Sequence, residues 1–345
     1  MHPRLRYLTL GVLLLMLVPL LAACGGSSST PTAAKKIKVG LVTDTGGLND
    51  KSFNHLADVG LENAKAQLGI QGDVVESHSA DDYVPNLTNF ASKNYDLVIG
   101  VGFLMQQAVG TVSGQFPNVH FAIIDGAGTD AQGNDLHHSN VESLLFKEQD
   151  AGALVGVIAG VLEKDGATPK KSHVIGAVGG VSIPPVNHYI AGYKWAATME
   201  DPSIKVLVGY SNDFNDPTKC SGVATSQIGA GADVLFQVAG GCGLGVIKAA
   251  DTANLYSIGV DADQKDSGTS VIASALKKVD VATFDAIQGV KNGTFQGGVQ
   301  TFSLQNGGVG YAADNLSLPA DVMAALTDMT TKIKSGQLTA PADIP

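Results

Sequence analysis

An acidic and amidic segment containing one aromatic residue is the strongest candidate for site chemistry. Residues 44–54 read DTGGLNDKSFN and follow the apolar residues 37–43. The two glycines allow the backbone to turn after Asp44, and the Asn, Asp and Ser residues can cap a following helix. Phe53 then falls in the first turn of that helix, close to the end of the strand. Its position is compatible with a ligand contact and equally with a core phenylalanine, so both interpretations stay open at this point.

Two further motifs imitate cofactor and metal sites without completing them. Residues 240–245 (GGCGLG) follow an apolar segment, but the glycines lack the G-x-G-x-x-G spacing of a dinucleotide site. A tight turn before a helix explains them better. Asp261, Asp263 and Asp266 resemble the start of a calcium loop, whose twelfth position requires Glu and is Ile272 here. We therefore expect neither a bound nucleotide cofactor nor calcium.

The remaining reactive residues show no catalytic or metal-binding spacing. His137 and His138 have no H-E-x-x-H motif or Cys/His cluster around them. A G-x-S-x-G nucleophile elbow and a Walker A motif are also missing from the sequence. We expect a protein that is not an enzyme and has no cofactor or metal. Carboxylates that meet only in the folded cleft are the one enzymatic alternative left open.

Short apolar segments alternate with longer amphipathic ones along the chain, which predicts strands and helices in turn. Strands that are apolar throughout and separated by helices are typical of parallel sheets covered on both faces, the doubly wound α/β pattern. The strands are expected at residues 37–43, 73–77, 96–101, 120–125, 174–178, 205–210, 233–238, 256–260 and 271–275. The helices are expected at residues 52–68, 105–115, 148–163, 187–199, 221–230, 245–252 and 281–292.

The pattern restarts near Lys171, after the Gly, Thr, Pro and Lys residues of the stretch 166–172. The chain is too long for a single sheet of this kind, so two α/β lobes are expected. Ligands of open parallel sheets lie beyond the carboxyl ends of the strands. Loops at several strand ends are polar or glycine-rich, and they would line one cleft if the lobes face each other: residues 44–47, 100–102, 125–126, 179–180, 212–214, 240–243 and 261–263.

The N-terminal residues predict export and lipid anchoring. Arg4 and Arg6 precede the apolar residues 8–20, a run with the length of a signal-peptide core. Residues 21–24 read LAAC, a lipobox, so residues 1–23 are expected to be a signal peptide and Cys24 the diacylated N-terminus, carrying fatty acids such as palmitate. Two acyl chains suffice for stable membrane attachment. An ordinary secretory signal with an incidental Cys is the alternative.

Residues 24–34 form a Gly/Ser/Thr-rich tether, and the folded part begins near Lys35. Without Arg4 and Arg6 the chain has 20 basic and 32 acidic residues, a net charge of −12. Such a surface disfavours a nucleic-acid partner, which requires a basic patch. The expected location is the extracytoplasmic face of the cell membrane, with attachment through lipid.

Cys220 and Cys242 remain after the anchor, in a compartment where disulfides persist. Cys220 follows the strand expected at 205–210, and Cys242 follows the strand expected at 233–238. Consecutive strands of such sheets are usually neighbours, so both Cys residues should lie in loops at one edge of a sheet. The sequence therefore predicts a disulfide between them.

Eight short motifs occur in order after the tether. They are D-x-G-G-x-N-D-x-S-F-N (44–54), F-A-I-I-D (121–125), F-x-E-Q-x-x-G-A-L-V-G (146–156), G-G-x-x-I-P-P-V (179–186), F-N-D-P (214–217), G-A-D-V (231–234), G-V-D-A-D-Q (259–264) and S-A-L-K-K-V-D (274–280). With them the sequence resembles the basic membrane protein lipoproteins, a family that includes the purine-nucleoside receptors of bacterial transport systems. The acidic charge of this chain departs from the family's name.

The resemblance implies a type I periplasmic-binding-protein fold, in which three crossover strands join two α/β lobes. One lobe would comprise residues 35–165 and 272–300, and the other residues 166–271 and 301–345. The resemblance also implies that Phe53 and Phe214 clamp a base from opposite lobes and that Asp125 hydrogen-bonds the base. Asp261 and Lys277 would hold the ribose hydroxyls, and the polar rim would consist of Asp44, Asn49 and Asp50.

The implied function is capture of nucleosides, purine nucleosides in the first place, for an ABC-type permease in the membrane. Stacking on aromatic rings suits a flat base, and charged groups suit a diol. A monomer is expected. The alternatives are a receptor of the same fold for a sugar or another small solute, and a surface signalling or adhesion lipoprotein.

Overall fold

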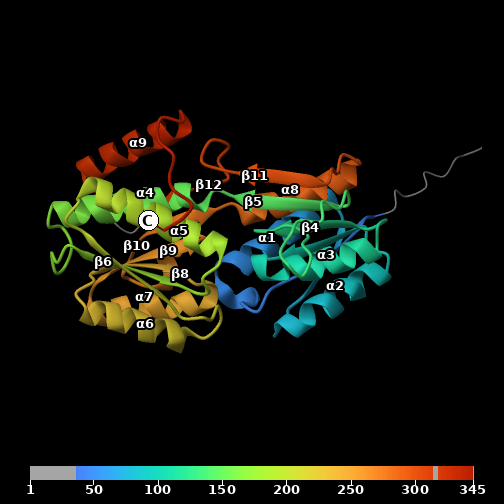
Figure 1. Ribbon diagram of the computed structural model, residues 1–345, viewed down its shortest axis with the longest axis horizontal. Coiled ribbons are helices and arrows are strands. Elements are labelled where there is room, and N and C mark those ends of the chain that lie inside the picture. The colour runs from blue at the N-terminus through green and yellow to red at the C-terminus, as the bar shows by residue number, and fades with distance from the viewer. Residues whose placement is uncertain (1–35, 314–317, 345) are drawn as a thin grey trace, which may run out of the picture. The chain divides into compact units, whose positions relative to one another are not determined.

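The computed structural model describes residues 36–313 and 318–344, which belong to one compact unit. Its strands form two six-stranded sheets (Figure 1). The first sheet has the order β11-β5-β4-β3-β1-β2, and every pair in it is parallel. Its strands are β1 (Lys38–Val42), β2 (Gln71–Val75), β3 (Leu97–Val101), β4 (His120–Ile124), β5 (Val141–Phe146) and β11 (Gly298–Phe302).

The second sheet repeats this order as β12-β10-β9-β8-β6-β7. All of its pairs are parallel except that between β10 and β12, which is antiparallel. Its strands are β6 (Val174–Gly179), β7 (Lys205–Tyr210), β8 (Val234–Val238), β9 (Tyr256–Asp261), β10 (Val271–Lys277) and β12 (Val309–Ala312). The expected doubly wound α/β class is confirmed.

Helices cover both faces of each sheet, as the continuous burial of strands such as β3 requires. On the first sheet, α1 (Phe53–Leu68) and α8 (Val279–Asn292) pack together on one face, and α2 (Tyr83–Ser92) and α3 (Gln106–Gln115) on the other. On the second sheet, α4 (Glu148–Lys164) and α5 (Pro184–Glu200) cover one face, with α9 (Ala320–Lys334) against α4. The other face carries α6 (Pro217–Gly229) and α7 (Leu244–Ala253) (Figure 1).

The chain passes between the sheets three times, and the crossings lie side by side. They follow β5 at Lys147, β10 at Lys278 and β11 at residues 303–308. The backbone N–H of Lys147 donates to the Phe302 carbonyl at 2.8 Å, and that of Lys278 donates to the Gly308 carbonyl at 2.9 Å. The crossings between β5 and α4 and between β10 and α8 begin next to the polar strand ends, so motion at this junction would change the space between the lobes.

All nine expected strands and seven expected helices are present; β7 has the expected ends, and the other elements differ at one or both ends. The largest strand shift is that of β2, which begins and ends two residues earlier than expected. Sequence reasoning missed β5, β11, β12, α2 and α9.

The expected division into lobes differs from the structure in two elements. Helix α4 was assigned to the first lobe, but it packs against α5, α9 and β10 of the second. Strand β10 falls in the range 272–300 that was assigned to the first lobe, yet it pairs with β9 and β12 in the second sheet. The reason is that each crossing follows the carboxyl end of a strand, so the chain changes lobe after β5 and after β10. Below, lobe 1 means the first sheet with α1, α2, α3 and α8, and lobe 2 the second sheet with its helices.

The predicted disulfide is present, but part of the reasoning behind it was wrong. Cys220 and Cys242 are joined with their Cα atoms 5.6 Å apart. However, β7 and β8 are not neighbours, because β6 lies between them. Cys220 also lies inside α6 and not in a loop. The bond forms because α6 and α7 pack side by side over that face of the sheet.

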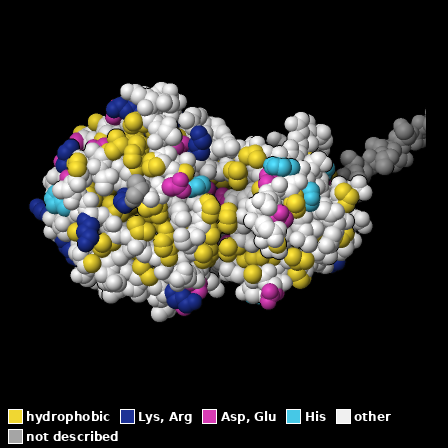
Figure 2. Space-filling view, in the orientation of Figure 1, with side chains coloured by type: hydrophobic (Ala, Val, Ile, Leu, Met, Phe, Trp, Pro, Cys, Tyr) yellow, Lys and Arg dark blue, Asp and Glu magenta, His cyan; other side chains and the backbone are white. Residues whose placement is uncertain are grey.

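The signal peptide, Cys24 and the tether lie outside the described residues. Within the described part, no helix combines the length and apolar character needed to cross a membrane. On the face shown in Figure 2, Lys and Arg side chains lie mostly on lobe 2, at separate positions that do not form one basic patch.

Candidate functional site

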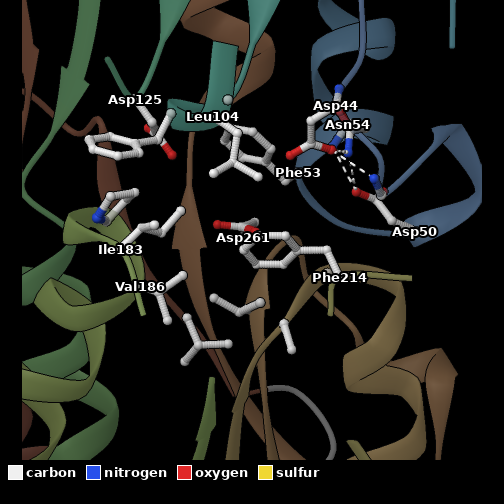
Figure 3. A pocket seen from close by; sticks show the side chains of 18 of the residues that line it. Asp44, Asp50, Phe53, Asn54, Leu104, Asp125, Ile183, Val186, Phe214 and Asp261 are labelled. Carbon is white, nitrogen blue, oxygen red and sulfur yellow. Dashed lines mark hydrogen bonds between the residues drawn. The ribbon is translucent and has the colours of Figure 1, made fainter. Parts of the chain in front are cut away.

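A cavity lies between the two lobes, at the carboxyl ends of their strands (Figure 3). It holds about 570 Å³ of empty space, including the part open to solvent. The structure brings seven of the eight predicted ligand residues to its wall: Asp44, Asp50, Phe53, Asp125, Phe214, Asp261 and Lys277. The eighth, Asn49, is exposed and does not line this cavity.

Hydrogen bonds between nearby residues fix the segment 44–54. Asp44 Oδ1 accepts from the Gly46 backbone N–H at 2.9 Å and from Asn54 Nδ2 at 2.8 Å. Asp50 Oδ1 accepts from the Ser52 backbone N–H at 2.9 Å, and Asp50 Oδ2 accepts from that of Asn54 at 2.8 Å. Asp50 thereby satisfies N–H groups at the start of α1, which no helical carbonyl can reach, and Asp44 fixes the turn at Gly46 and the Asn54 side chain. The two carboxylates hold Phe53, the first residue of α1, at the cavity wall.

Lys277 is the charged centre of the site. It ends β10, and only 2% of its surface is exposed. Its Nζ donates to Asp125 Oδ2 at 2.6 Å and to Glu148 Oε1 at 2.9 Å. Nζ also lies 5.1 Å from the centroid of the Phe53 ring and 4.7 Å from that of Phe146. A buried ammonium group requires such partners, because burial without them would neutralise it.

Sequence reasoning missed Glu148, although it lies in one of the family motifs (F-x-E-Q). Glu148 is the first residue of α4, and its other oxygen, Oε2, lies 3.0 Å from His188 Nδ1. The histidine is partly exposed and belongs to α5, as does the missed cavity residue Tyr189. Sequence spacing does not predict their contacts, because each partner is distant in sequence: Glu148 bonds to Lys277, His188 to Glu148 and Tyr189 to Asp261.

Asp125 directly follows β4, and Asp261 is the last residue of β9. These two strands occupy equivalent positions in the two sheets. Both aspartates have left-handed backbones, with φ of 66° and 61°. Such conformations are costly for residues other than glycine, and they persist where surrounding contacts enforce them. Asp261 accepts hydrogen bonds from both lobes, from Ser52 Oγ at 2.8 Å and from the Tyr189 hydroxyl at 3.1 Å.

Burial sets the electrostatics of the carboxyl groups. It raises the pKa of Asp125 to about 7, although the attraction of Lys277 works in the opposite direction. It raises the pKa of Asp44 to about 6 and also raises that of Asp261. For Lys277, burial alone would lower the pKa, but Asp125, Glu148 and Asp261 outweigh it and raise the value. The site therefore keeps one cation among several acids.

The other walls are apolar. Phe53 of lobe 1 and Phe214 of lobe 2 both line the cavity, with Leu104, Ile183 and Val186 beside them (Figure 3). The Phe214 ring lies against Gly180, where any Cβ atom would collide with it. Flat apolar surfaces beside hydrogen-bonding charges suit a solute with an aromatic face and a polar edge. The described residues contain no group of three or more His, Cys, Asp or Glu side chains able to hold a metal ion.

Comparisons with known proteins agree with a binding site of this kind. The family model described as ABC transporter substrate-binding protein PnrA-like matches residues 37–343. An uncharacterised lipoprotein of Pyrococcus abyssi is 36% identical over 317 residues, which cover 88% of this chain and 76% of that protein. An ABC transporter nucleoside-binding protein of Lactococcus lactis subsp. cremoris is 31% identical, and the match covers 98% of this chain and 99% of that protein.

Among solved structures, a solute-binding protein of an ABC transporter system from Aeropyrum pernix K1 has a TM-score of 0.79 and 29% identity. That match covers 89% of this chain and 94% of the other. The fold is thus the expected type I periplasmic-binding-protein fold. The expectation that the chain is not an enzyme is confirmed, since the family consists of non-catalytic binding proteins. The chain belongs to the PnrA-like substrate-binding proteins, which bind a small solute for an ABC transporter.

Proposed function

We propose that this protein captures nucleosides, with a preference for purine nucleosides, in the cavity between its lobes. The observation that carries the proposal is the pair Phe53 and Phe214, which line one cavity from opposite lobes beside a buried Lys277 and several carboxyl groups. Stacking of a base on an aromatic ring is worth about 1–3 kcal/mol. The nucleoside-binding relative from Lactococcus lactis supports the same class of solute.

Each side chain has a role in this proposal. Phe53 and Phe214 stack on the two faces of the base, and Asp125 accepts a hydrogen bond from its polar edge. Asp261 and Lys277 hold the ribose hydroxyls through charge-assisted hydrogen bonds, which are stronger than neutral ones. Because these contacts come from both lobes, the solute stabilises the closed arrangement and shifts an equilibrium that exists without it.

The cellular role follows from the N-terminal sequence and the family. Cys24, diacylated after cleavage, holds the protein on the extracytoplasmic face of the membrane, beside the permease that receives the solute. The names of relatives such as the Pyrococcus abyssi lipoprotein support this anchoring. Replacement of Cys24 by Ala should abolish stable membrane attachment, which detergent-phase partitioning would reveal.

A thermal-shift screen against nucleosides, free bases, sugars and amino acids tests the proposal. A ligand present at about 100 times its Kd stabilises the folded state by about 2.7 kcal/mol, which raises the Tm visibly. We expect a shift with inosine, guanosine or adenosine and none with sugars. A shift with a sugar or an amino acid alone would contradict the nucleoside assignment, and the family membership would still hold.

A further inference from the structure

The disulfide lies directly behind the segment that carries Phe214. Cys220 is in the first turns of α6, and Cys242 is in the short helix η4 (Gly240–Gly243) that precedes α7. Both side chains are fully buried. Phe214 itself lies in the segment 211–216, which connects β7 to α6. The bond therefore joins the helix that follows Phe214 to the helical turn that lies behind it.

Contacts from Cys242 reach Phe214 directly. The backbone N–H of Cys242 donates to the Phe214 carbonyl at 3.0 Å. Its Sγ lies 3.4 Å from the hydroxyl of Ser211, at the start of the same segment. Ideal Cβ atoms at Gly240 and Gly241 would also contact the Phe214 carbonyl at ordinary distances, so η4 lies closely against the backbone of this segment.

The position of β7 explains why such a link is needed. This strand is at the edge of the second sheet and pairs only with β6. Inside the segment, Asp213 Oδ1 accepts the N–H groups of Asn215 and Asp216, and Asp213 pairs with Lys219 on α6. These bonds are local and do not reach β8 or η4. The Cys220–Cys242 bond joins α6, which follows the segment, to η4, which follows β8.

We propose that the Cys220–Cys242 disulfide is a positioning device for Phe214 and thereby sets the affinity of the binding site. This inference rests on the proposed role of Phe214 as a ligand contact. A disulfide normally stabilises by restricting the unfolded chain. Here it also fixes the native position of the segment that presents the aromatic ring, so the solute does not have to order that segment when it binds.

The test uses the full-length protein in detergent and the double variant Cys220→Ala, Cys242→Ala. Hydrogen exchange of residues 211–216 and 240–244 should become faster, with little change in β8, β9 and α5. Affinity for the nucleoside found in the screen should fall by about 5- to 30-fold, the factor expected when the backbone of one or so residues must be ordered on binding. Both measurements are made well below the Tm of the variant.

Leu255→Ala is the matched control, because Leu255 is buried in lobe 2 before β9, at the end of the sheet away from the cavity. It should lower stability without changing exchange in residues 211–216 or the affinity. If the double variant does not fold, Cys220→Val with Cys242→Ala refills the space and replaces it.

Unchanged exchange in residues 211–216, or exchange that rises equally across lobe 2, would overturn the positioning role. Unchanged affinity with faster exchange would also overturn it. If the wild type binds no nucleoside at all, the proposed function fails, and the exchange measurement still decides whether the disulfide fixes the segment.

Discussion

The two lobes have the same strand order but supply different chemistry to the cavity. Each sheet places an aspartate with a left-handed backbone at the same point, Asp125 after β4 and Asp261 at the end of β9. The next strand of each sheet ends differently, with Phe146 on β5 and Lys277 on β10. Asp125, Asp261 and Lys277 line the cavity, and the Lys277 ammonium lies 4.7 Å from the centroid of the Phe146 ring. Different residue types at equivalent strand ends thus make the site asymmetric.

The two lobes also hold their aromatic residues by different means. In lobe 1, hydrogen bonds to Asp44 and Asp50 fix the segment before Phe53. In lobe 2, a covalent bond lies behind Phe214. Carboxylates also order the segment before α6, where Asp213 accepts the N–H groups of Asn215 and Asp216. The disulfide is therefore an additional link in lobe 2, one that joins α6 to η4 beyond the local segment.

The largest effect is expected for Lys277→Met, which removes the charge that lobe 2 inserts between Asp125 and Glu148. Breaking a buried ion pair from one side costs about 3–5 kcal/mol, because the remaining charges stay buried. The loss should be measured by urea unfolding at pH 8 and should shrink at pH 5, where the raised pKa of Asp125 lets it become neutral. Lys278→Met, at an exposed neighbouring position, is the control. Equal stability of Lys277→Met and wild type at pH 8 would contradict the buried network.

The second effect compares the two aromatic residues. Phe214→Ala and Phe53→Ala should each weaken nucleoside binding by about 1–3 kcal/mol, or roughly 5- to 150-fold. Phe214→Ala should leave stability nearly intact, because Phe214 lies in a cleft segment, while Phe53→Ala should also destabilise the start of α1. Phe90→Ala, in the core of lobe 1, is the reference and should cost about 3–5 kcal/mol of stability. Calorimetric binding and chemical unfolding of each variant separate the two quantities, and wild-type affinity in Phe214→Ala would sink the stacking model.

The sequence was sufficient for the architecture because its buried strands are apolar throughout. β3 and β8 are buried along their whole length and were predicted within a residue at each end. β11 and β12 were missed, since they are short and lie at sheet edges, where exposed positions dilute the apolar pattern. The same dilution affects β5, which carries Glu142 and Ser143.

Only part of the candidate site could be predicted, because some of its residues contact each other from positions that are far apart in the sequence. Motifs at strand ends identified Asp44, Phe53 and Asp125, because ligands of such sheets lie there. Glu148 bonds to Lys277 and His188 bonds to Glu148, and sequence spacing predicts neither contact. Asn49, which was carried over with its motif, lies in a short helical turn, η1 (Leu48–Asp50), is exposed and does not line the cavity, so its place in the polar rim stays a prediction.

A second difference between the lobes lies away from the cavity. Glu163, at the end of α4, and Asp233, just before β8, are fully buried, and Glu163 Oε1 and Asp233 Oδ1 have no hydrogen-bond partner among the described groups. We infer that a proton on Glu163 lies between the two carboxyl groups. Burial raises the pKa of Glu163 to about 8, and Asp233 adds to the effect. At the same place in lobe 1, Asp96 is only half-buried and accepts from the Lys38 backbone N–H.

This difference predicts how stability depends on pH. The folded state keeps a proton on Glu163 that the unfolded chain releases above its ordinary pKa, so stability falls as the pH rises from about 4.5 to about 8. Glu163→Gln keeps the hydrogen bond without the proton and should be more stable than wild type at pH 8, by about 1–3 kcal/mol, with a smaller difference at pH 5. Glu62→Gln, on the exposed face of α1, is the control. If the free energy of unfolding depends on pH in the same way for wild type and Glu163→Gln, Glu163 does not carry a proton in the folded state at pH 8.

The smallest effect on affinity is expected for the hydrogen bond that Ser52 of lobe 1 makes to Asp261 of lobe 2. Ser52 of lobe 1 does not line the cavity, but its Oγ lies 2.8 Å from Asp261 Oδ2 and 3.1 Å from the Val260 carbonyl of lobe 2. The Gln264 side-chain amide donates to the Lys51 carbonyl at 3.4 Å beside it. These bonds join lobe 1 to lobe 2, so separation of the lobes would break them. We therefore expect Ser52 to hold Asp261, a proposed ligand residue, only while the lobes stay together.

Ser52→Ala should lower nucleoside affinity by about 2- to 10-fold, the value of one hydrogen bond, mainly through faster dissociation. Ser257→Ala is the matched control, because Ser257 is equally buried on β9 and bonds within lobe 2, to Ser270. It should change stability and leave affinity alone. Small-angle scattering without solute should show a larger open fraction for Ser52→Ala than for Ser257→Ala. If both variants bind the nucleoside as tightly as wild type does, the hydrogen bond from Ser52 to Asp261 does not contribute to affinity. The lobes would then be held together by the solute alone.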